Sequence, residues 1–263
     1  MTMQPRFHKQ IVIATLAVLS LVGTAVYATH AWGNYHWARQ TNPFTLKLGD
    51  NVSTAWDSSL VLASSDWSQS SVLDSPVVTG STNPKNCRPV SGRVEVCNNR
   101  YGNNGWLGIA SIWATGDHIT QGTVKVNDTY FSTVKYNTAE WRNFVMCQEI
   151  GHTFGLDHQD ENFDNTPLGT CMDYTSDPTP NQHPNQHDYD QLEAIYSHLD
   201  SFTTLSQSLF SSPRNFGQAE NAQPAEEADW GKAIRHSANG RTSLYERDLG
   251  AGRKIFTFII WAD

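Results

Sequence analysis

The residues best suited to chemistry lie close together, in the stretch QEIGHTFGLDH over residues 148–158. On a helix, residues four apart share one face, so Gln148 and His152 point the same way. Glu149 points about 100° away from Gln148, which suits a general base beside a metal-bound water rather than a ligand. Gly155 lets the chain leave the helix and double back, so that His158 approaches the same ion from a second direction.

This stretch resembles the HExxHxxGxxH zinc signature of the metzincin metalloproteases, the clan of the matrix metalloproteinases and astacins. The run GTCMDYT places Met172 fourteen residues after His158, where that clan has its Met-turn. The resemblance implies Zn²⁺ as the cofactor, with His152 and His158 as ligands and Glu149 as the general base. It also implies Met172 as the floor beneath the metal, and Tyr174 as a hydrogen-bond donor to the tetrahedral intermediate or a fifth ligand.

One position departs from the signature, because Gln148 stands where the first zinc-binding histidine belongs. A neutral amide oxygen is a weaker zinc donor than imidazole, thiolate or carboxylate, so we expect a loss of zinc affinity of at least about 10-fold. The ligand charge is unchanged, so a zinc held by Gln148, His152 and His158 still activates its water. Other candidates for a third ligand are polar residues of loops and strand ends: His118, Asp160, His183 and His187.

These residues predict a secreted zinc endopeptidase in which Glu149 takes a proton from the zinc-bound water. The expected partner is a protein or peptide substrate, lying extended along Gly108, Ile109 and Ala110, which look like the edge strand that pairs with substrate in such enzymes. Two alternatives stay open. One is a pseudo-protease that binds without cleaving because of Gln148, and the other is a structural zinc site closed by four protein ligands.

The four cysteines of an exported chain indicate two disulfides. Cys87 and Cys97 flank a turn-like Pro-Val-Ser-Gly run, which favours a local bridge between them. Cys147 and Cys171 would lie close enough to bridge if the Met-turn sits beneath the helix, as the resemblance implies. A zinc thiolate is the alternative for this second pair, and the even number of cysteines favours the disulfide.

The helix that carries Gln148 is expected to begin at Asn137, with Glu140 three residues later in a capping-box-like pattern, and to end at Gly155. Apolar periodicity predicts the remaining elements. They are strands over 58–65, 75–81, 106–114 and 118–128, an amphipathic helix over 187–199, and a β-hairpin over 243–263 around Gly250 and Gly252.

The expected fold class is α+β. The catalytic domain is expected to be zincin- or metzincin-like, with a twisted mixed β-sheet, an active-site helix and a C-terminal helix, plus a small β-rich C-terminal extension. At 263 residues the chain is long enough to bury one full core. The expected divisions are a signal peptide or N-terminal anchor (1–31), the metalloprotease domain (32–202), a Ser-, Gln-, Ala- and Pro-rich linker (203–228) and a β-hairpin extension (229–263).

The N-terminus has the pattern of a secretory signal peptide, with Arg6 and Lys9 before an apolar run over residues 11–28 and small residues after it. An uncleaved membrane anchor is the alternative, because 18 apolar residues reach the length of a span. Removal of residues 1–31 moves the net charge from −8 to −10. An acidic body without a basic stripe argues against nucleic acid as a partner. The sequence predicts no oligomeric state.

Overall fold

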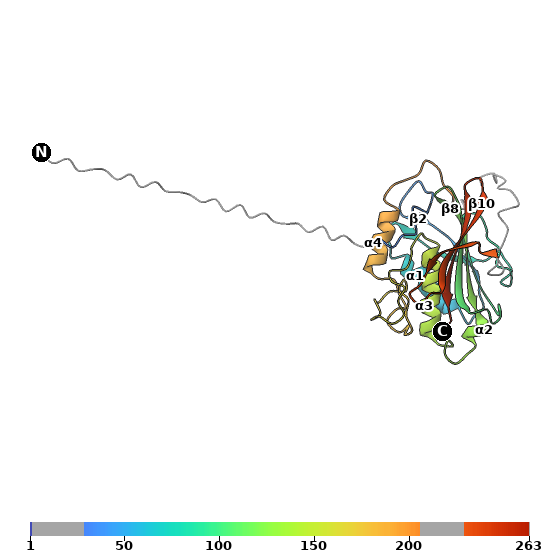
Figure 1. Ribbon diagram of the computed structural model, residues 1–263. Helices are drawn as coiled ribbons and strands as arrows, with labels where there is room; N and C mark the ends of the chain where they lie inside the picture. The colour runs from blue at the N-terminus through green and yellow to red at the C-terminus, as the bar shows by residue number, and fades with distance from the viewer. Residues whose placement is uncertain (2–28, 206–228, 263) are drawn as a thin grey trace.

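The computed structural model describes residues 1, 29–205 and 229–262. Residues 2–28 of the predicted signal peptide or anchor and most of the predicted linker lie outside these ranges. Within them, no helix combines the length and apolar character needed to cross a bilayer. The described chain is α+β, with a mixed sheet and four helices, as the sequence predicts. Figure 1 shows α1, α3 and α4 on one side of the sheet.

Nine strands of the described chain form one mixed sheet, in the order β5-β3-β6-β8-β7-β11-β10-β9, and β1 also pairs with β8. The first strands are parallel: β1 (His36–Trp37), β3 (Leu48–Asn51), β5 (Val77–Thr79), β6 (Val94–Asn99) and β8 (His118–Asn127). Antiparallel pairing then runs outward from β8 through β7 (Trp106–Thr115), β11 (Arg253–Trp261), β10 (Thr242–Gly250) and β9 (Lys232–His236). A separate parallel pair joins β2 (Phe44–Thr45) and β4 (Leu73–Asp74).

The strands predicted over 106–114 and 118–128 are confirmed as β7 and β8, and β5 lies within the strand predicted over 75–81. Nine of the ten residues of β7 are buried. A strand with neighbours on both edges and cover on both faces has no solvent side, so it reads as a continuous rather than an alternating apolar run.

The helix that carries Gln148 is α3 (Ala139–His152), with its N-cap one residue later than predicted and its end three residues before Gly155. Its N-cap is Thr138, whose hydroxyl oxygen accepts a hydrogen bond from the Trp141 backbone N–H at 3.3 Å. Asn137 is not the cap, because its side-chain oxygen accepts a hydrogen bond from Arg142 Nη2 at 2.6 Å instead. Adjacent Asn and Thr residues are both good caps, so tertiary contacts decide between them.

The strand predicted over 58–65 is wrong, because these residues belong to helix α1 (Asp57–Trp67). The buried apolar residues Trp56, Leu60, Ala63 and Trp67 recur every three or four positions, which is the helical period. The two tryptophans that complete this pattern lie outside the short apolar run on which the strand prediction rested.

The second predicted helix is present as α4 (Gln186–Ile195), and α2 (Asp128–Phe131) is a single turn. Asn185 and Asp188 form a capping box at the start of α4. The helix ends before residue 199 because the Tyr196 carbonyl accepts a hydrogen bond from Asn42 Nδ2 at 2.9 Å. The Tyr196 hydroxyl also donates to the Phe154 carbonyl at 2.8 Å, which ties the helix end to the loop after α3.

The C-terminal hairpin is confirmed as β10 and β11, with Gly250 and Gly252 both at positive φ in the turn. It is not a separate extension, however. Strand β11 pairs with β7 along its whole length and so continues the central sheet, where the late strands lie beside the earlier ones (Figure 1). The run IFTFII is buried at every position, and such a strand needs cover on both faces.

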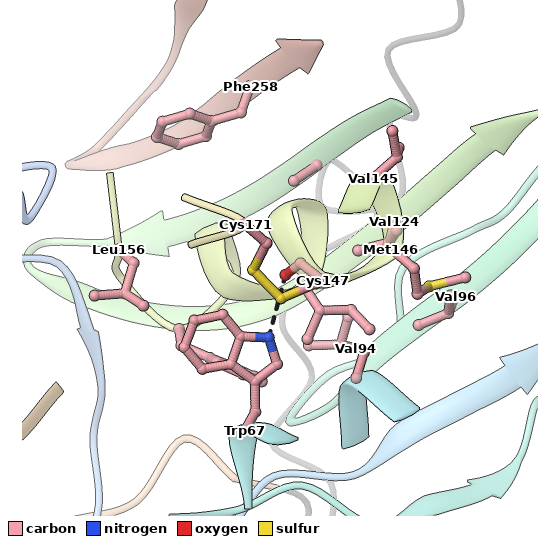
Figure 2. Packing of buried hydrophobic residues seen from close by; sticks show 14 of the residues in the cluster. Trp67, Val94, Val96, Val124, Val145, Met146, Cys147, Leu156, Cys171 and Phe258 are labelled. Carbon is pink, nitrogen blue, oxygen red and sulfur yellow. Dashed lines mark hydrogen bonds between the residues drawn. A yellow bond between two sulfur atoms is a disulfide. The ribbon is translucent and has the colours of Figure 1, made fainter. Parts of the chain in front are cut away.

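The main core packs α1 and α3 against the sheet, and Figure 2 shows part of it. Cys147 of α3 is joined to Cys171, and Cys87 to Cys97, the two pairs that the sequence analysis favours. Trp67 Nε1 donates a 3.1 Å hydrogen bond to the Cys147 carbonyl (Figure 2). The Cys147–Cys171 disulfide and this hydrogen bond therefore link α3, the loop at Cys171 and α1 at one point.

Candidate metal centre

The centre lies on the last turn of α3 and in the loop that follows. Gln148, Glu149 and His152 are fully buried, and His158 is nearly so. The chain turns back at Gly155, whose φ of +102° lies in the region that favours glycine. A Cβ at Gly155 would also lie 2.7 Å from the Tyr35 carbonyl oxygen. A tight, glycine-dependent exit from the helix therefore carries His158 back to His152.

The two histidines face each other through their Nε2 atoms, 3.0 Å apart. His152 Nδ1 lies 2.9 Å from the Leu156 carbonyl oxygen, and His158 Nδ1 lies 2.8 Å from Glu161 Oε1. Both partners can only accept hydrogen bonds, so each neutral ring carries its proton on Nδ1 and a lone pair on Nε2. Two lone pairs pointing at each other across 3.0 Å repel unless a cation or a proton lies between them.

A shared proton is the weaker explanation of this contact. Burial, and then the neighbouring His158, lower the pKa of His152 well below its usual value. Glu161 keeps a lowered pKa even though burial raises it, because it accepts a hydrogen bond from His158 and lies near the cationic Arg235. A carboxylate that holds Nδ1–H of a ligand histidine is a common support of protein metal sites. The pair therefore fits a metal ion.

Gln148 has a side chain with no partner among the described residues. Both Nε2 and Oε1 are buried without a hydrogen bond. Most buried side-chain polar atoms of folded proteins are hydrogen-bonded, and leaving one unpaired costs about 1–3 kcal/mol. Gln148 lies one helical turn before His152, on the same face of α3. An amide oxygen left without a hydrogen bond on that face is suited to bind a metal ion as a ligand.

Glu149 is buried on the neighbouring face of α3, against β7 and β11. Neither carboxyl oxygen has a hydrogen bond of normal geometry. Burial raises its pKa well above the usual value, and the backbone N–H groups of Ala110 and Ile260 offset part of that effect. A Cβ at Gly108 would lie 2.7 Å from Glu149 Oε1, so the absence of a side chain at Gly108 makes room for this carboxyl group.

Met172 packs directly beneath α3. A Cβ at Gly151 would lie 2.6 Å from Met172 Sδ and 2.8 Å from the Trp67 ring, so only glycine allows this approach. The Met172 carbonyl accepts a hydrogen bond from the Gln159 backbone N–H at 2.6 Å, which ties the turn to the loop that carries His158.

Tyr174 lies beside His158, with ring centroids 4.3 Å apart. Its hydroxyl donates a 3.0 Å hydrogen bond to the backbone carbonyl of Ile259. Burial, followed by the nearby carboxylates, raises the pKa of Tyr174 well above its usual value, so the hydroxyl keeps its proton and remains a donor.

The expectation that Gly108, Ile109 and Ala110 form an open edge is wrong for this structure. Strand β11 pairs with them, with Ile259 opposite Ile109. The Phe258 ring stacks on His152 with centroids 4.1 Å apart and planes 13° apart, and Figure 2 shows Phe258 reaching from β11 toward α3. The sequence signal for this contact was the unbroken apolar character of the last strand.

Two charged residues near the centre, Glu161 and Arg235, were not predicted from the sequence. Glu161 supports His158, and its place three residues after that histidine was the available signal. Arg235 of β9 forms an ion pair with Asp157 and approaches Glu161 to 4.0 Å. Nothing in the local sequence links Arg235 to the centre, because strand pairing some 75 residues later brings it there.

The alternative third ligands have other partners. His183 Nδ1 lies 2.7 Å from Asp66 Oδ2, and the His187 ring stacks on His30 at 4.6 Å. Asp160 accepts a hydrogen bond from the backbone of the turn that it begins, and His118 approaches Asp200 to 3.3 Å. Among the described residues, none of the four joins His152 and His158 in a cluster of ligand atoms.

Fold and site together define an α+β protein with a buried pair of histidines, an unpaired glutamine and a buried glutamate. No family model and no curated protein matches the chain. Among solved structures it is similar to high choriolytic enzyme 1, a hatching enzyme zinc-protease from Oryzias latipes (medaka fish). The TM-score is 0.36, with 9% identity over 65% of this chain and 99% of that chain. A likeness of this size defines neither a family nor an activity.

Proposed function

We propose that this protein is a secreted, zinc-dependent endopeptidase with a zincin-like fold, and that Gln148, His152 and His158 hold the metal. The observation that carries the proposal is the 3.0 Å approach of the two Nε2 atoms, with both Nδ1 atoms directed at acceptors. Imidazole nitrogen is a preferred zinc ligand, and the unpaired Gln148 amide offers an oxygen beside it. When bound, zinc supplies Lewis acidity toward a peptide carbonyl and a water molecule.

The chain's own groups would then share the proton transfers. Glu149 would accept a proton from the attacking water and deliver it to the nitrogen of the leaving amine. The Tyr174 hydroxyl would donate a hydrogen bond to the carbonyl oxygen on which negative charge develops. A raised pKa suits a carboxyl group that must both accept and return a proton near neutral pH.

Strand β11 pairs with β7 at Gly108, Ile109 and Ala110, the residues proposed to pair with substrate. The carbonyl of Ile259 accepts the Tyr174 hydrogen bond, and the N–H of Ile260 faces Glu149. Both ends of one peptide group thus meet the two proposed catalytic side chains, while the strand pairs with β7. We therefore propose that the endopeptidase is self-occupied in this conformation, and that substrate pairs with Gly108, Ile109 and Ala110 only after β11 leaves.

The test uses the full, oxidised chain. Zinc content and cleavage of casein or gelatin are measured for wild type, Glu149→Ala and Gln148→His, with Glu140→Ala on the first turn of α3 as a matched control. Stoichiometric zinc in wild type, and cleavage that is lost only in Glu149→Ala, would support the proposal. Absence of both zinc and cleavage in wild type, with both appearing in Gln148→His, would overturn the proposal.

A further inference from the structure

A second group of metal-ligand residues lies apart from the α3 centre. His36 of β1 is paired with His118 of β8 in the sheet register, and the segment after α4 brings His198 and Asp200 to them. His36 Nε2 lies 3.1 Å from His198 Nε2. Asp200 Oδ1 lies 3.4 Å from His36 Nε2, 3.3 Å from His118 Nε2 and 3.8 Å from His198 Nε2. One carboxylate oxygen therefore faces three imidazole nitrogens.

The position of the proton on the neutral His36 ring determines whether its Nε2 presents a lone pair to the cluster. Its Nδ1 lies 2.8 Å from the Asn34 carbonyl oxygen, which only accepts, so Nδ1 carries the proton of the neutral ring. The lone pair of Nε2 then points at His198 Nε2 and at the carboxylate oxygen. When His198 carries its proton on Nδ1, three electron-rich atoms face one another here, and a cation among them would satisfy all three.

Protons on the rings account for the cluster less well. His36 is buried, and the Asp200 side chain is only 9% exposed. Arg39 Nη1 lies 3.2 Å from Asp200 Oδ2, and its backbone N–H donates to the same oxygen at 3.1 Å. The second oxygen, Oδ1, is left directed at the histidines. A cationic Arg39 nearby adds to the penalty for two charged imidazoles in contact.

We propose that His36, His198 and Asp200 bind a second divalent metal ion, of the zinc class, and that His118 positions the Asp200 carboxylate. Zinc bonds of about 2.0–2.2 Å in tetrahedral geometry place ligand atoms about 3.3 Å apart. The three separations here are 3.1, 3.4 and 3.8 Å. Two imidazoles and one carboxylate form a ligand set that zinc accepts, with room for a fourth ligand from solvent.

The site is accessible to an ion. His36 and His198 both line a cavity of about 600 Å³, which they share with residues of the N-terminal loop and of α4. A metal bound here would link β1 to the segment after α4, two parts of the chain about 160 residues apart. Binding to a site that exists only in the folded chain stabilises the fold by mass action.

The experiment counts zinc in the full chain. The protein is stripped with a chelator, dialysed against Zn²⁺ and analysed by native mass spectrometry and elemental analysis, for wild type, His198→Ala, His152→Ala and the double variant. His236→Ala, a surface histidine of β9, is the matched control. We expect two zinc ions in wild type and in the control, one in each single variant and none in the double variant. Zn²⁺ affinity at the second site should fall at least about 10-fold in His198→Ala.

The outcome separates this site from the α3 centre. One zinc in wild type that His198→Ala removes and His152→Ala keeps would support the second site while refuting the proposed α3 ligands. One zinc that His152→Ala removes and His198→Ala keeps would overturn the second site, as would no zinc at all. The His198 side chain is 53% exposed, so its truncation leaves the core intact, and near-ultraviolet circular dichroism checks the fold. Asp200→Asn, which preserves shape, provides an independent variant with the same expected loss.

Discussion

The Tyr174 hydroxyl donates a 3.0 Å hydrogen bond to the backbone carbonyl of Ile259, 85 residues further along the chain. This contact joins a residue proposed to bind substrate to a strand of the same molecule that pairs with β7. It follows that access to the centre depends on how firmly β11 is held. In the proposed self-occupied state, strand β11 would protect the site, because a bound strand excludes water and other peptides alike.

Loosening β11 above His152 should increase cleavage. Phe258→Ala removes the ring that stacks on His152 and admits water to the centre. The variant should cleave casein faster than wild type, although loss of a buried phenylalanine costs about 3–5 kcal/mol of folding stability. Phe256→Ala is the matched control, since that ring is also buried on β11 but packs against Trp32 and Tyr35. Equal rates in the two variants would indicate general loosening of the fold rather than release of the centre.

The contribution of Gln148 to zinc binding can be measured at its own position. Gln148→His supplies a stronger donor and should raise Zn²⁺ affinity at least about 10-fold, whereas Gln148→Leu supplies none and should lower it by at least as much. Competition with a chromophoric chelator measures both changes. An affinity in Gln148→Leu equal to that of wild type would exclude the amide as a ligand.

The two disulfides should differ in their effect on the centre. Cys147–Cys171 closes a sequence separation of 24 and Cys87–Cys97 one of 10. In the chain-entropy account, their removal by paired Cys→Ala changes costs about 3.5 and about 2.7 kcal/mol respectively. Urea unfolding measures these losses. Only the first removal should weaken zinc binding, because Cys147 precedes Gln148 and Cys171 precedes Met172. An equal loss of zinc affinity on removal of either disulfide would show that Cys87–Cys97 also supports the centre.

Stability should rise with pH above neutrality because of Lys125. Its side chain is 7% exposed on β8, and burial lowers its pKa from 10.5 to about 8. Between those values the unfolded chain binds more protons than the folded chain, so the free energy of unfolding increases with pH. Lys125→Met should remove this slope and stabilise the protein at pH 7 by about 1–3 kcal/mol. Urea unfolding at pH 7 and pH 9.5 tests this, with exposed Lys85→Met as the control. A wild-type stability that falls over this window would contradict it.

Local sequence determined the parts of the protein that depend on neighbouring residues. The spacing of Gln148, Glu149 and His152 suits one helix, and Gly155, three residues after that helix ends, turns the chain back in a backbone conformation that other residues resist. The strands β7 and β8 and the hairpin turn at Gly250 likewise follow from short patterns of apolar residues and glycines.

Only the tertiary structure decided what these elements meet. Strand β11 pairs with β7, and His36 lies against His198, through contacts between segments roughly 140 to 160 residues apart. Such pairings depend on which buried surfaces fit together, and no period in the local sequence records them. The stretch that became α1 was misread for the same reason, since its helical pattern is completed by tryptophans buried against other elements. Spacing along the chain thus determined which groups could bind a metal, and long-range packing decided that the chain's own last strand covers them.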